Sequence, residues 1–326
     1  MTEGVLNWRI DMEKMIRLGI STCLLGEKVR YDGGHKLNRF LTDTLGKYVQ
    51  YVPVCPEVEC GLSVPREPMH LVGDPRAPRL VTFFTKQDHT ERMVQWAHRR
   101  IIELKKEDLS GFIFKSNSPS SGMERVRIYN GKGIAKKKGV GIFAQIFMEC
   151  FPLLPVEDES RLHKPKIREN FIERIFTLKR WREIPEKKSC ETLVDFHTKH
   201  KLLILSHSPS HYYRMEKLVA GAKDISKDEL FQQYQALLTE ALKMRTTLKK
   251  NSKVLQQLLG YFKKKLLTDE KKELVEAIDS YGQGNVPLIV PLTLMNHHAR
   301  KYGLSNLKDQ YYLHPHPLEL QMRNHA

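Results

Sequence analysis

A cysteine and a glutamate stand together where a short apolar run of the sequence ends. Residues 51–54 favour a buried β-strand, and the run breaks at Cys55-Pro56-Glu57. A thiol and a carboxylate at the end of a strand are suited to bind a metal or to form a thiol-based catalytic site. A single cysteine in such a run is more often an ordinary core residue, so repetition of the arrangement is the stronger signal.

The same arrangement occurs twice more along the chain. Residues 16–20 form another apolar run that leads into Cys23, and residues 111–115 form a third that leads into the serine-rich loop 116–122. Amphipathic helical segments separate the three runs, which predicts an α/β domain with a parallel sheet. Because such sheets bind their ligands beyond the carboxyl ends of the strands, the three loops predict a single site.

The three loops resemble those of a known family. STCLLGEKVRYDGG, PVCPEVECGL and KSNSPSSGMERVRIY are similar to the signature loops of the thiouracil desulfidase (TudS) family. Residues from about 190 to 324 resemble the YbgA-type helical domain that is fused to it in some bacteria, in desulfidases that act on thiouridine in tRNA. The resemblance covers nearly the whole chain and implies an α/β parallel-sheet N-terminal domain followed by an all-α C-terminal domain.

The resemblance also implies a cofactor. In that family three cysteines hold a four-iron four-sulfur cluster whose fourth iron is free to take the sulfur of the substrate. Cys23 and Cys55 match the first two cysteine positions, whereas Ser121 stands at the third. The third ligand is then either Ser121, through its oxygen, or Cys60, which lies close to Cys55 in the sequence. Loss of the cluster is the remaining alternative.

Catalytic and substrate-binding candidates lie in the same loops. A desulfidase must activate water against the thiocarbonyl carbon and protonate the leaving sulfur, and Glu57 is the candidate acid and base. A loop salt bridge is the alternative role for Glu57. Ser118 and Ser120 are candidates for orienting the base or the water, although an ordinary turn would use the same residues. Candidates for substrate binding are Arg30, Asp32 and Lys115, and a turn role is equally open for Asp32.

The composition is that of a soluble globular protein. A chain of 326 residues with 40% hydrophobic and 28% charged residues has room for two domains with their own cores. No stretch approaches the roughly 18 apolar residues of a membrane span. The N-terminal residues MTEGVLNWRIDMEKMI contain no apolar signal core. Five cysteines without regular spacing fit a reducing compartment, so we expect a cytoplasmic protein.

Charge and periodicity divide the chain near residue 158. Residues 1–158 carry 24 Lys and Arg against 19 Asp and Glu, and residues 159–326 carry 30 against 19. The formal net charge of +16 favours a polyanionic partner, and most of it lies in the second, helical part. We therefore expect a cluster-binding domain over 1–158 and an RNA-binding domain over 159–326. Its candidate RNA contacts are cations that alternate with tyrosines, namely Lys199, Lys201, Arg214, Lys217, Lys263, Lys264 and Lys265.

Two segments near the candidate site carry local predictions. Residues 36–49 have apolar side chains at helical spacing and predict a helix. Residues 67–79 contain three prolines and a glycine and predict a loop.

Three functions are compatible with these observations. The first is a cluster-dependent, non-redox desulfidase that converts a thiolated uracil base to uracil with loss of sulfide, and we expect its substrate to be thiouridine in tRNA. The second is an RNA-binding or regulatory protein that has lost the cluster, with Ser121 as the mark of that loss. The third is a thiol-based enzyme with Cys55 as nucleophile and Glu57 as its base. None of the three requires a protein partner.

Overall fold

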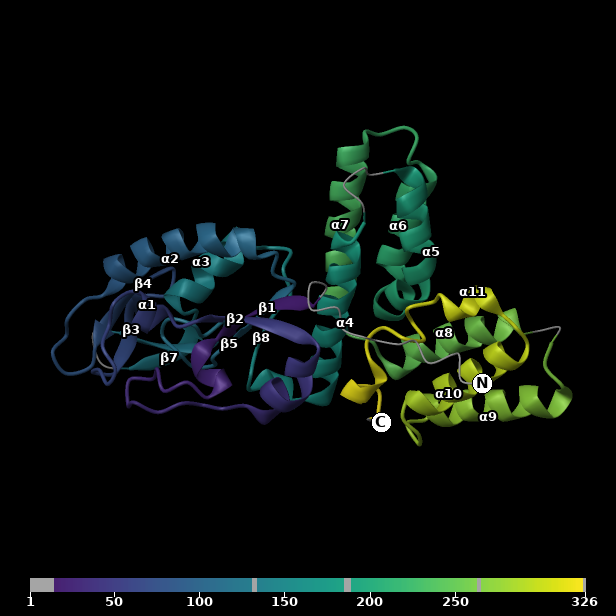
Figure 1. The fold of residues 1–326 in the computed structure, drawn as a ribbon, viewed down its shortest axis with the longest axis horizontal. Helices are drawn as coiled ribbons and strands as arrows, with labels where there is room; N and C mark the ends of the chain where they lie inside the picture. Colours follow the sequence, from purple (N-terminus) through teal and green to yellow (C-terminus); the bar gives the residue numbers. More distant parts are fainter. Residues whose placement is uncertain (1–14, 131–133, 185–188, 263–264, 325–326) are drawn as a thin grey trace. The chain divides into compact units, whose positions relative to one another are not determined.

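Four parallel strands form the centre of the first of two compact units. The computed structural model describes residues 15–130, 134–184, 189–262 and 265–324. The chain divides into Met1–His163 and Lys164–Ala326, shown in Figure 1. The central sheet has the order β2-β1-β5-β8, and each neighbouring pair is parallel. Its strands are β1 (Ile16–Ser21), β2 (Val49–Val54), β5 (Gly111–Phe114) and β8 (Val156–Asp158).

The register of this sheet aligns the carboxyl ends of its strands. Ser21 at the end of β1 lies opposite Val54 at the end of β2, and Phe114 at the end of β5 lies opposite Asp158 at the end of β8. The three strands predicted from the sequence are confirmed, and so is the parallel α/β class of this unit. The fourth strand, β8, is too short for its sequence to have predicted it.

Two helices cover the upper face of the sheet in the view of Figure 1, α2 (Thr90–Leu104) and α3 (Ile142–Cys150). Phe112 and Phe114 of β5 contact Phe143 and Phe147 of α3 with ring centroids 4.7 to 6.3 Å apart. All four rings are buried. This aromatic core fixes α3 on the strand that precedes the serine-rich loop.

A second sheet in the same unit has the order β4-β3-β6-β7. Its strands are β3 (Met69–Asp74), β4 (Ala77–Thr82), β6 (Val126–Tyr129) and β7 (Ala135–Gly139). The prediction of a loop over residues 67–79 is therefore wrong. Pro75 lies in the turn of the β3–β4 hairpin, and Pro78 lies on β4, an edge strand, where a missing N–H is tolerated.

The helix predicted over residues 36–49 is also wrong. Its first part is a loop, in which the amide of Lys36 donates to the carbonyl of Cys23 at 2.8 Å and that of Asn38 donates to Leu24 at 3.0 Å. Only two short helical segments follow, Phe40–Thr44 and Leu45–Lys47. A third short helix, α1 (Pro56–Glu59), follows β2. The loop after β1 is thus held across the end of the sheet instead of leaving it as a helix.

The second unit is helical, as the sequence predicts. In Figure 1, α5, α6 and α7 stand side by side, and α8, α9 and α10 form a second group that runs roughly at right angles to them, with α8 in contact with α5. Among the described residues, no helix is long and apolar enough to span a membrane. The helices of the unit are α4 (Pro165–Arg182), α5 (Cys190–His207), α6 (Pro209–Ala220), α7 (Lys227–Lys243), α8 (Leu248–Tyr261), α9 (Thr268–Gly282), α10 (Ile289–Lys301) and α11 (Ser305–Lys308).

Candidate functional site

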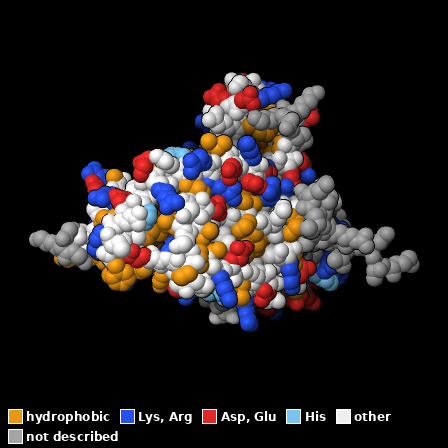
Figure 2. Space-filling view, turned by 60° about the vertical axis from the view of Figure 1, so that its left-hand side comes forward, with side chains coloured by type: hydrophobic (Ala, Val, Ile, Leu, Met, Phe, Trp, Pro, Cys, Tyr) orange, Lys and Arg blue, Asp and Glu red, His pale blue; other side chains and the backbone are white. Residues whose placement is uncertain are grey.

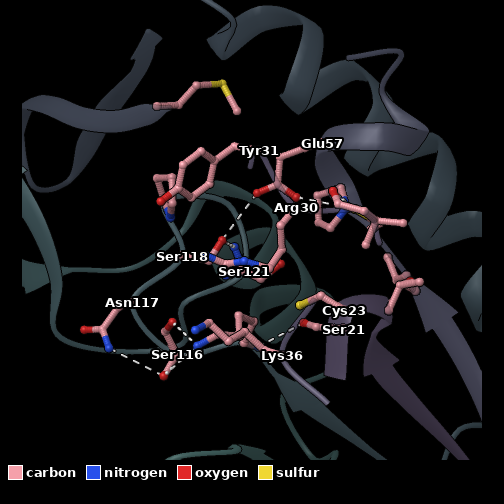
Figure 3. A pocket seen from close by; sticks show the side chains of 18 of the residues that line it. Ser21, Cys23, Arg30, Tyr31, Lys36, Glu57, Ser116, Asn117, Ser118 and Ser121 are labelled. Carbon is pink, nitrogen blue, oxygen red and sulfur yellow. Dashed lines mark hydrogen bonds between the residues drawn. The ribbon is translucent and has the colours of Figure 1, made fainter. Parts of the chain in front are cut away.

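A cavity of about 420 Å³ lies at the carboxyl ends of the parallel strands. Its volume is in the range of small-molecule sites. Figure 3 shows Cys23, Glu57 and Ser121 at this cavity, each from the segment that follows a different strand. Its lining mixes apolar with polar and charged side chains and includes Ser21, Cys23, Arg30, Cys55, Glu57, Arg66, Pro68, Met69, Lys115, Ser116, Ser118 and Ser121.

Cys23 and Cys55 are both buried and both line this cavity. Burial, and then the nearby Glu57 carboxylate, raise the pKa of the Cys23 thiol to about 11 and that of Cys55 to about 12. A thiol with such a pKa is protonated at neutral pH, so Cys55 is a poor nucleophile on its own. The third hypothesis, a thiol-based enzyme, would therefore need Glu57 to take the Cys55 proton, and a ligand role would require that each sulfur lose its proton to the metal site.

Ser121 supplies the third donor of the cavity. It is 3% exposed, and its amide donates to Ser118 Oγ at 3.1 Å. Cys60 lies outside the cavity lining, and its Sγ donates to the Glu57 carbonyl at 3.2 Å. Among the described residues, no three His, Cys, Asp or Glu side chains are grouped as metal ligands. At the three positions of the expected ligands, the cavity therefore offers two sulfur donors and the hydroxyl oxygen of Ser121.

Glu57 is held by the serine-rich loop. Ser120 Oγ donates to Glu57 Oε1 at 2.5 Å, and Ser118 Oγ lies 3.5 Å from the same oxygen. The two serine hydroxyls are 2.9 Å apart. On the other side, Cys55 Sγ and Arg66 Nη2 lie 3.7 and 3.9 Å from Glu57 Oε2. The Glu57 carboxylate lies beside a sulfur and next to two hydroxyls that are hydrogen-bonded to each other. It can accept and return a proton at this position.

The N-terminus of α3 fixes the serine-rich loop. The Gly141 amide donates to the Gly122 carbonyl at 2.7 Å, and that of Ala144 donates to Ser120 at 3.1 Å. The free N–H groups of the first helical turn are thereby used to hold loop carbonyls. The side chains of Ser120 and Ser121 face the site, so the backbone contacts with α3 hold these two residues in position.

The expected substrate-binding residues divide into two groups. Arg30 and Lys115 line the cavity. Asp32 is outside its lining and accepts the Gly34 amide at 3.0 Å, with Arg30 Nε 3.4 Å away. The Gly34 hydrogen bond and the Arg30 charge hold the pKa of Asp32 below its usual value. In this structure Asp32 closes a turn and orients Arg30.

Glu159 is a site residue that sequence reasoning missed. It directly follows β8, and its carboxylate accepts hydrogen bonds from Lys115 Nζ, from the Ser116 amide at 2.6 Å and from Ser116 Oγ at 2.8 Å. These bonds fix Lys115 at the cavity wall. Recognition of β8 as the fourth parallel strand would have found Glu159, since it occupies the position after that strand that Cys55 occupies after β2.

The expected RNA contacts lie on several helices of the second unit. Lys199 pairs with Asp195 at 2.8 Å, and Lys201 Nζ lies 5.9 Å from the centre of the Tyr261 ring. Arg214, Lys217 and Lys265 are exposed. Lys263 and Lys264 lie outside the described residues.

Two family models match the chain. The model of 2-thiouracil desulfurase matches residues 18–159, and that of a protein of unknown function, DUF1722, matches residues 201–317. The uncharacterized protein YbbK of Bacillus subtilis (strain 168) is 31% identical over 137 residues, which cover 40% of this chain and 89% of YbbK. The uncharacterized protein YbgA of Escherichia coli (strain K12) is 29% identical over 133 residues, which cover 40% of this chain and 79% of YbgA.

A solved structure also matches. The 4Fe-4S-dependent thiouracil desulfidase TudS is 30% identical, with 45% of this chain and 93% of that chain covered, at a TM-score of 0.38. The chain belongs to the 2-thiouracil desulfurase family through its first unit. Its second unit is of the DUF1722 type, and YbgA is one of its relatives. The matched residues 18–159 contain every lining residue of the cavity that is named above.

Proposed function

We propose that the protein removes sulfur from a thiolated uracil by hydrolysis, with a four-iron four-sulfur cluster as cofactor. The observation that carries the proposal is the cavity in which two buried thiols, a buried hydroxyl and Glu57 meet, in a chain of the 2-thiouracil desulfurase family. Its volume of about 420 Å³ suffices for a nucleobase. We further propose that the natural substrate is thiouridine within tRNA.

The donors of the cavity fit a cluster with one open position. Cys23 and Cys55 would each hold an iron through sulfur, and Ser121 would hold a third through oxygen, so that the fourth iron has no protein ligand. When bound, such a cluster supplies a Lewis acid for the sulfur of the substrate. Arg30, Arg66 and Lys115 place positive charge around the cavity, which offsets the negative charge of thiolate ligands and cluster.

The overall reaction replaces the sulfur atom of the substrate by an oxygen atom from water. The thiocarbonyl and water give a carbonyl and hydrogen sulfide, with no electron gained or lost. Glu57 would take a proton from the attacking water and later deliver a proton to the departing sulfur. Ser118 and Ser120 would hold the carboxylate in place, because Ser120 Oγ donates to it at 2.5 Å.

The second unit would bind the tRNA. In support, Arg214, Lys217 and Lys265 are exposed, and Tyr213 beside them in the sequence is 63% exposed. Exposed cations and aromatic rings on one unit suit a partner with phosphates and unstacked bases. Charge reversal at Arg214 and Lys217 should weaken tRNA binding and make it less dependent on salt.

One observation favours a second candidate function. The third expected cysteine is Ser121, and oxygen is a weaker ligand than thiolate for this soft metal centre. A protein that had lost the cluster could still bind RNA without chemistry. Iron content after anaerobic reconstitution separates the two candidates.

The experiment compares single cysteine variants after reconstitution with iron and sulfide. We expect Cys23→Ala and Cys55→Ala to lose bound iron and thiouracil turnover together, because one remaining thiolate cannot hold the cluster. Cys150→Ala is the matched control, since Cys150 is exposed on α3 and should leave both quantities unchanged. Full iron retention in the first two variants would refute the ligand assignment.

A further inference from the structure

The second sheet of the first unit has one buried and one exposed face. Leu71, Leu80 and Ile128 are buried on the inner face. On the outer face, the register places Val72 of β3 between Arg79 of β4 and Tyr129 of β6. The pairing of Arg127 with Lys137 extends that face to β7. Val72, Arg79, Arg127 and Tyr129 on this face are at least partly exposed, and such a face is available for binding.

Four aromatic rings gather at one end of this face. The ring of His70 meets those of Phe83 and Tyr129 edge to face, at 5.4 and 5.1 Å between centroids. Phe84 meets Phe83 in the same way at 5.2 Å. Phe83 is 48% exposed and Phe84 is 71% exposed. Phenylalanine is normally a core residue, so two neighbouring exposed rings require an explanation.

The loop that carries the two phenylalanines is held in place by hydrogen bonds. The Glu67 carboxylate accepts bonds from the Phe84 amide, from the Thr85 amide at 2.8 Å and from Thr85 Oγ1 at 2.7 Å. The amide of Gln87 donates to Thr82 Oγ1 at 2.8 Å across the base of the loop. These hydrogen bonds hold the loop in the conformation in which both phenylalanine rings are exposed to solvent.

Exposed cations accompany these rings. Lys86 Nζ lies 5.3 Å from the centre of the Phe83 ring, and Arg127 and residues 136–138, all lysine, are exposed. Arg79 pairs with Asp88, whereas Arg127 and Lys137 have no ion pair with a described carboxylate. Figure 2, turned so that the left-hand side of Figure 1 comes forward, shows orange and blue side chains distributed over the face in view. Such a face attracts a partner with negative charge and flat rings.

The segment that precedes β3 is shared by the cavity and the loop that carries the rings. Pro68 and Met69 line it, and His70 is the next residue along β3. The amide of Phe83 donates to the Pro68 carbonyl at 2.8 Å, and Glu67, which holds the loop, precedes Pro68. Because side chains alternate along a strand, Met69 faces the cavity and His70 faces the opposite side of β3, so a nucleotide strand with one base in the cavity would pass around the start of β3 to meet the exposed rings.

We propose that this aromatic–basic surface, made of His70, Phe83, Phe84, Arg127, Tyr129 and Lys137, binds the unpaired nucleotides next to the thiolated base of an RNA substrate. The inference rests on the proposed function and extends it, because it gives the first unit its own RNA contacts. The rings stack on bases and the cations meet phosphates. Since stacking accepts any base, the surface favours single-stranded RNA without a fixed sequence.

The test measures binding of a fluorescent oligouridylate to the full chain by anisotropy. We expect Phe84→Ala and Phe83→Ala to raise the Kd about tenfold each, since stacking on one ring is worth roughly 1–3 kcal/mol per base. Lys137→Ala should lower the dependence of log Kd on log salt by about 0.7, the value of one phosphate contact on a single strand. Ile102→Ala is the matched control, because Ile102 is 60% exposed on α2, away from this surface, and should bind as the wild type does.

If both phenylalanine variants unfold at the wild-type temperature and bind the oligouridylate with unchanged Kd, the proposal is overturned. The surface would then be a candidate for binding a protein partner. An equal loss in Ile102→Ala overturns it as well. The oligouridylate contains no sulfur, so its binding is independent of catalysis. A protein that binds through Phe84 but leaves thiouracil intact contradicts only the proposed desulfidase activity.

Discussion

Gly141 lies against the serine-rich loop, and an alanine there should impair the site while the protein stays folded. A Cβ at this position would lie 2.5 Å from the backbone carbonyl carbon and oxygen of Ser120 and 2.8 Å from the Gly122 nitrogen. The Gly141 backbone itself, with φ of −65° and ψ of 145°, is open to any residue. The effect of Gly141→Ala is therefore steric and acts on the loop.

The expected magnitude follows from these distances. Ordinary Cβ contacts begin at 3.4 Å, so the Ser120 backbone must move by about 1 Å. Such a displacement breaks the 2.5 Å bond from Ser120 Oγ to Glu57 and shifts Ser121. A misplacement of about 1 Å lowers catalytic efficiency about 100-fold, and overpacking lowers the free energy of unfolding by about 1–3 kcal/mol.

The assay is kcat/KM for free 2-thiouracil after anaerobic reconstitution, together with urea unfolding. Gly260→Ala on α8 is the matched control, because no atom of the described residues lies within 4 Å of its added Cβ. It should keep full activity and gain roughly 0.5–1 kcal/mol of stability from the helical preference of alanine. Wild-type kcat/KM in Gly141→Ala would refute the claim that the position of this loop limits the reaction.

Three further predictions concern the ligands, the base and the response to acid. Ser121→Cys should raise the iron retained after reconstitution, because it provides a third thiolate, whereas Cys60→Ala should leave iron unchanged; iron lost from Cys60→Ala alone would transfer the ligand role to Cys60. Glu57→Gln should keep its iron but lose about 10²–10⁴-fold in kcat, and a wild-type kcat would remove Glu57 from the mechanism. Burial lowers the pKa of His316 to about 4 in the folded chain, against 6.5 when unfolded, so the unfolded chain takes up the proton first. The contribution of His316 to the free energy of unfolding is complete above pH 6.5 and declines by up to about 3 kcal/mol as the pH falls to 4. Urea unfolding of His316→Asn should therefore show a smaller decrease of this free energy between pH 6.5 and pH 4. A decrease equal to that of the wild type would exclude His316 as its source.

The parts of the fold that consist of regular apolar strands could be predicted from the sequence. Three apolar runs, each followed by a polar loop, sufficed to predict a parallel sheet with Cys23, Cys55 and Ser121 at one edge, because parallel strands end on the same side. The structure brings these residues together at one cavity. That Cys60 lies outside it depends on the one-turn helix α1, whose geometry the sequence pattern does not determine.

Other features depend on contacts between distant segments. Glu159 follows a strand of three residues, which is shorter than any detectable alternation of apolar and polar residues. The hairpin β3–β4 contains prolines that predict a loop unless the edge position of β4 is known. The exposure of Phe84 depends on Glu67, 17 residues earlier in the chain. Local sequence contains none of this information.

The most direct test of the central claim follows the atoms of the reaction. The reconstituted protein is incubated anaerobically with 2-thiouracil in ¹⁸O-labelled water without any reductant, and uracil and sulfide are measured. The proposed hydrolysis predicts one sulfide for each uracil, with ¹⁸O at the carbon that carried sulfur. Thiouracil left intact by cluster-loaded protein, or turnover that requires a reductant, would contradict it.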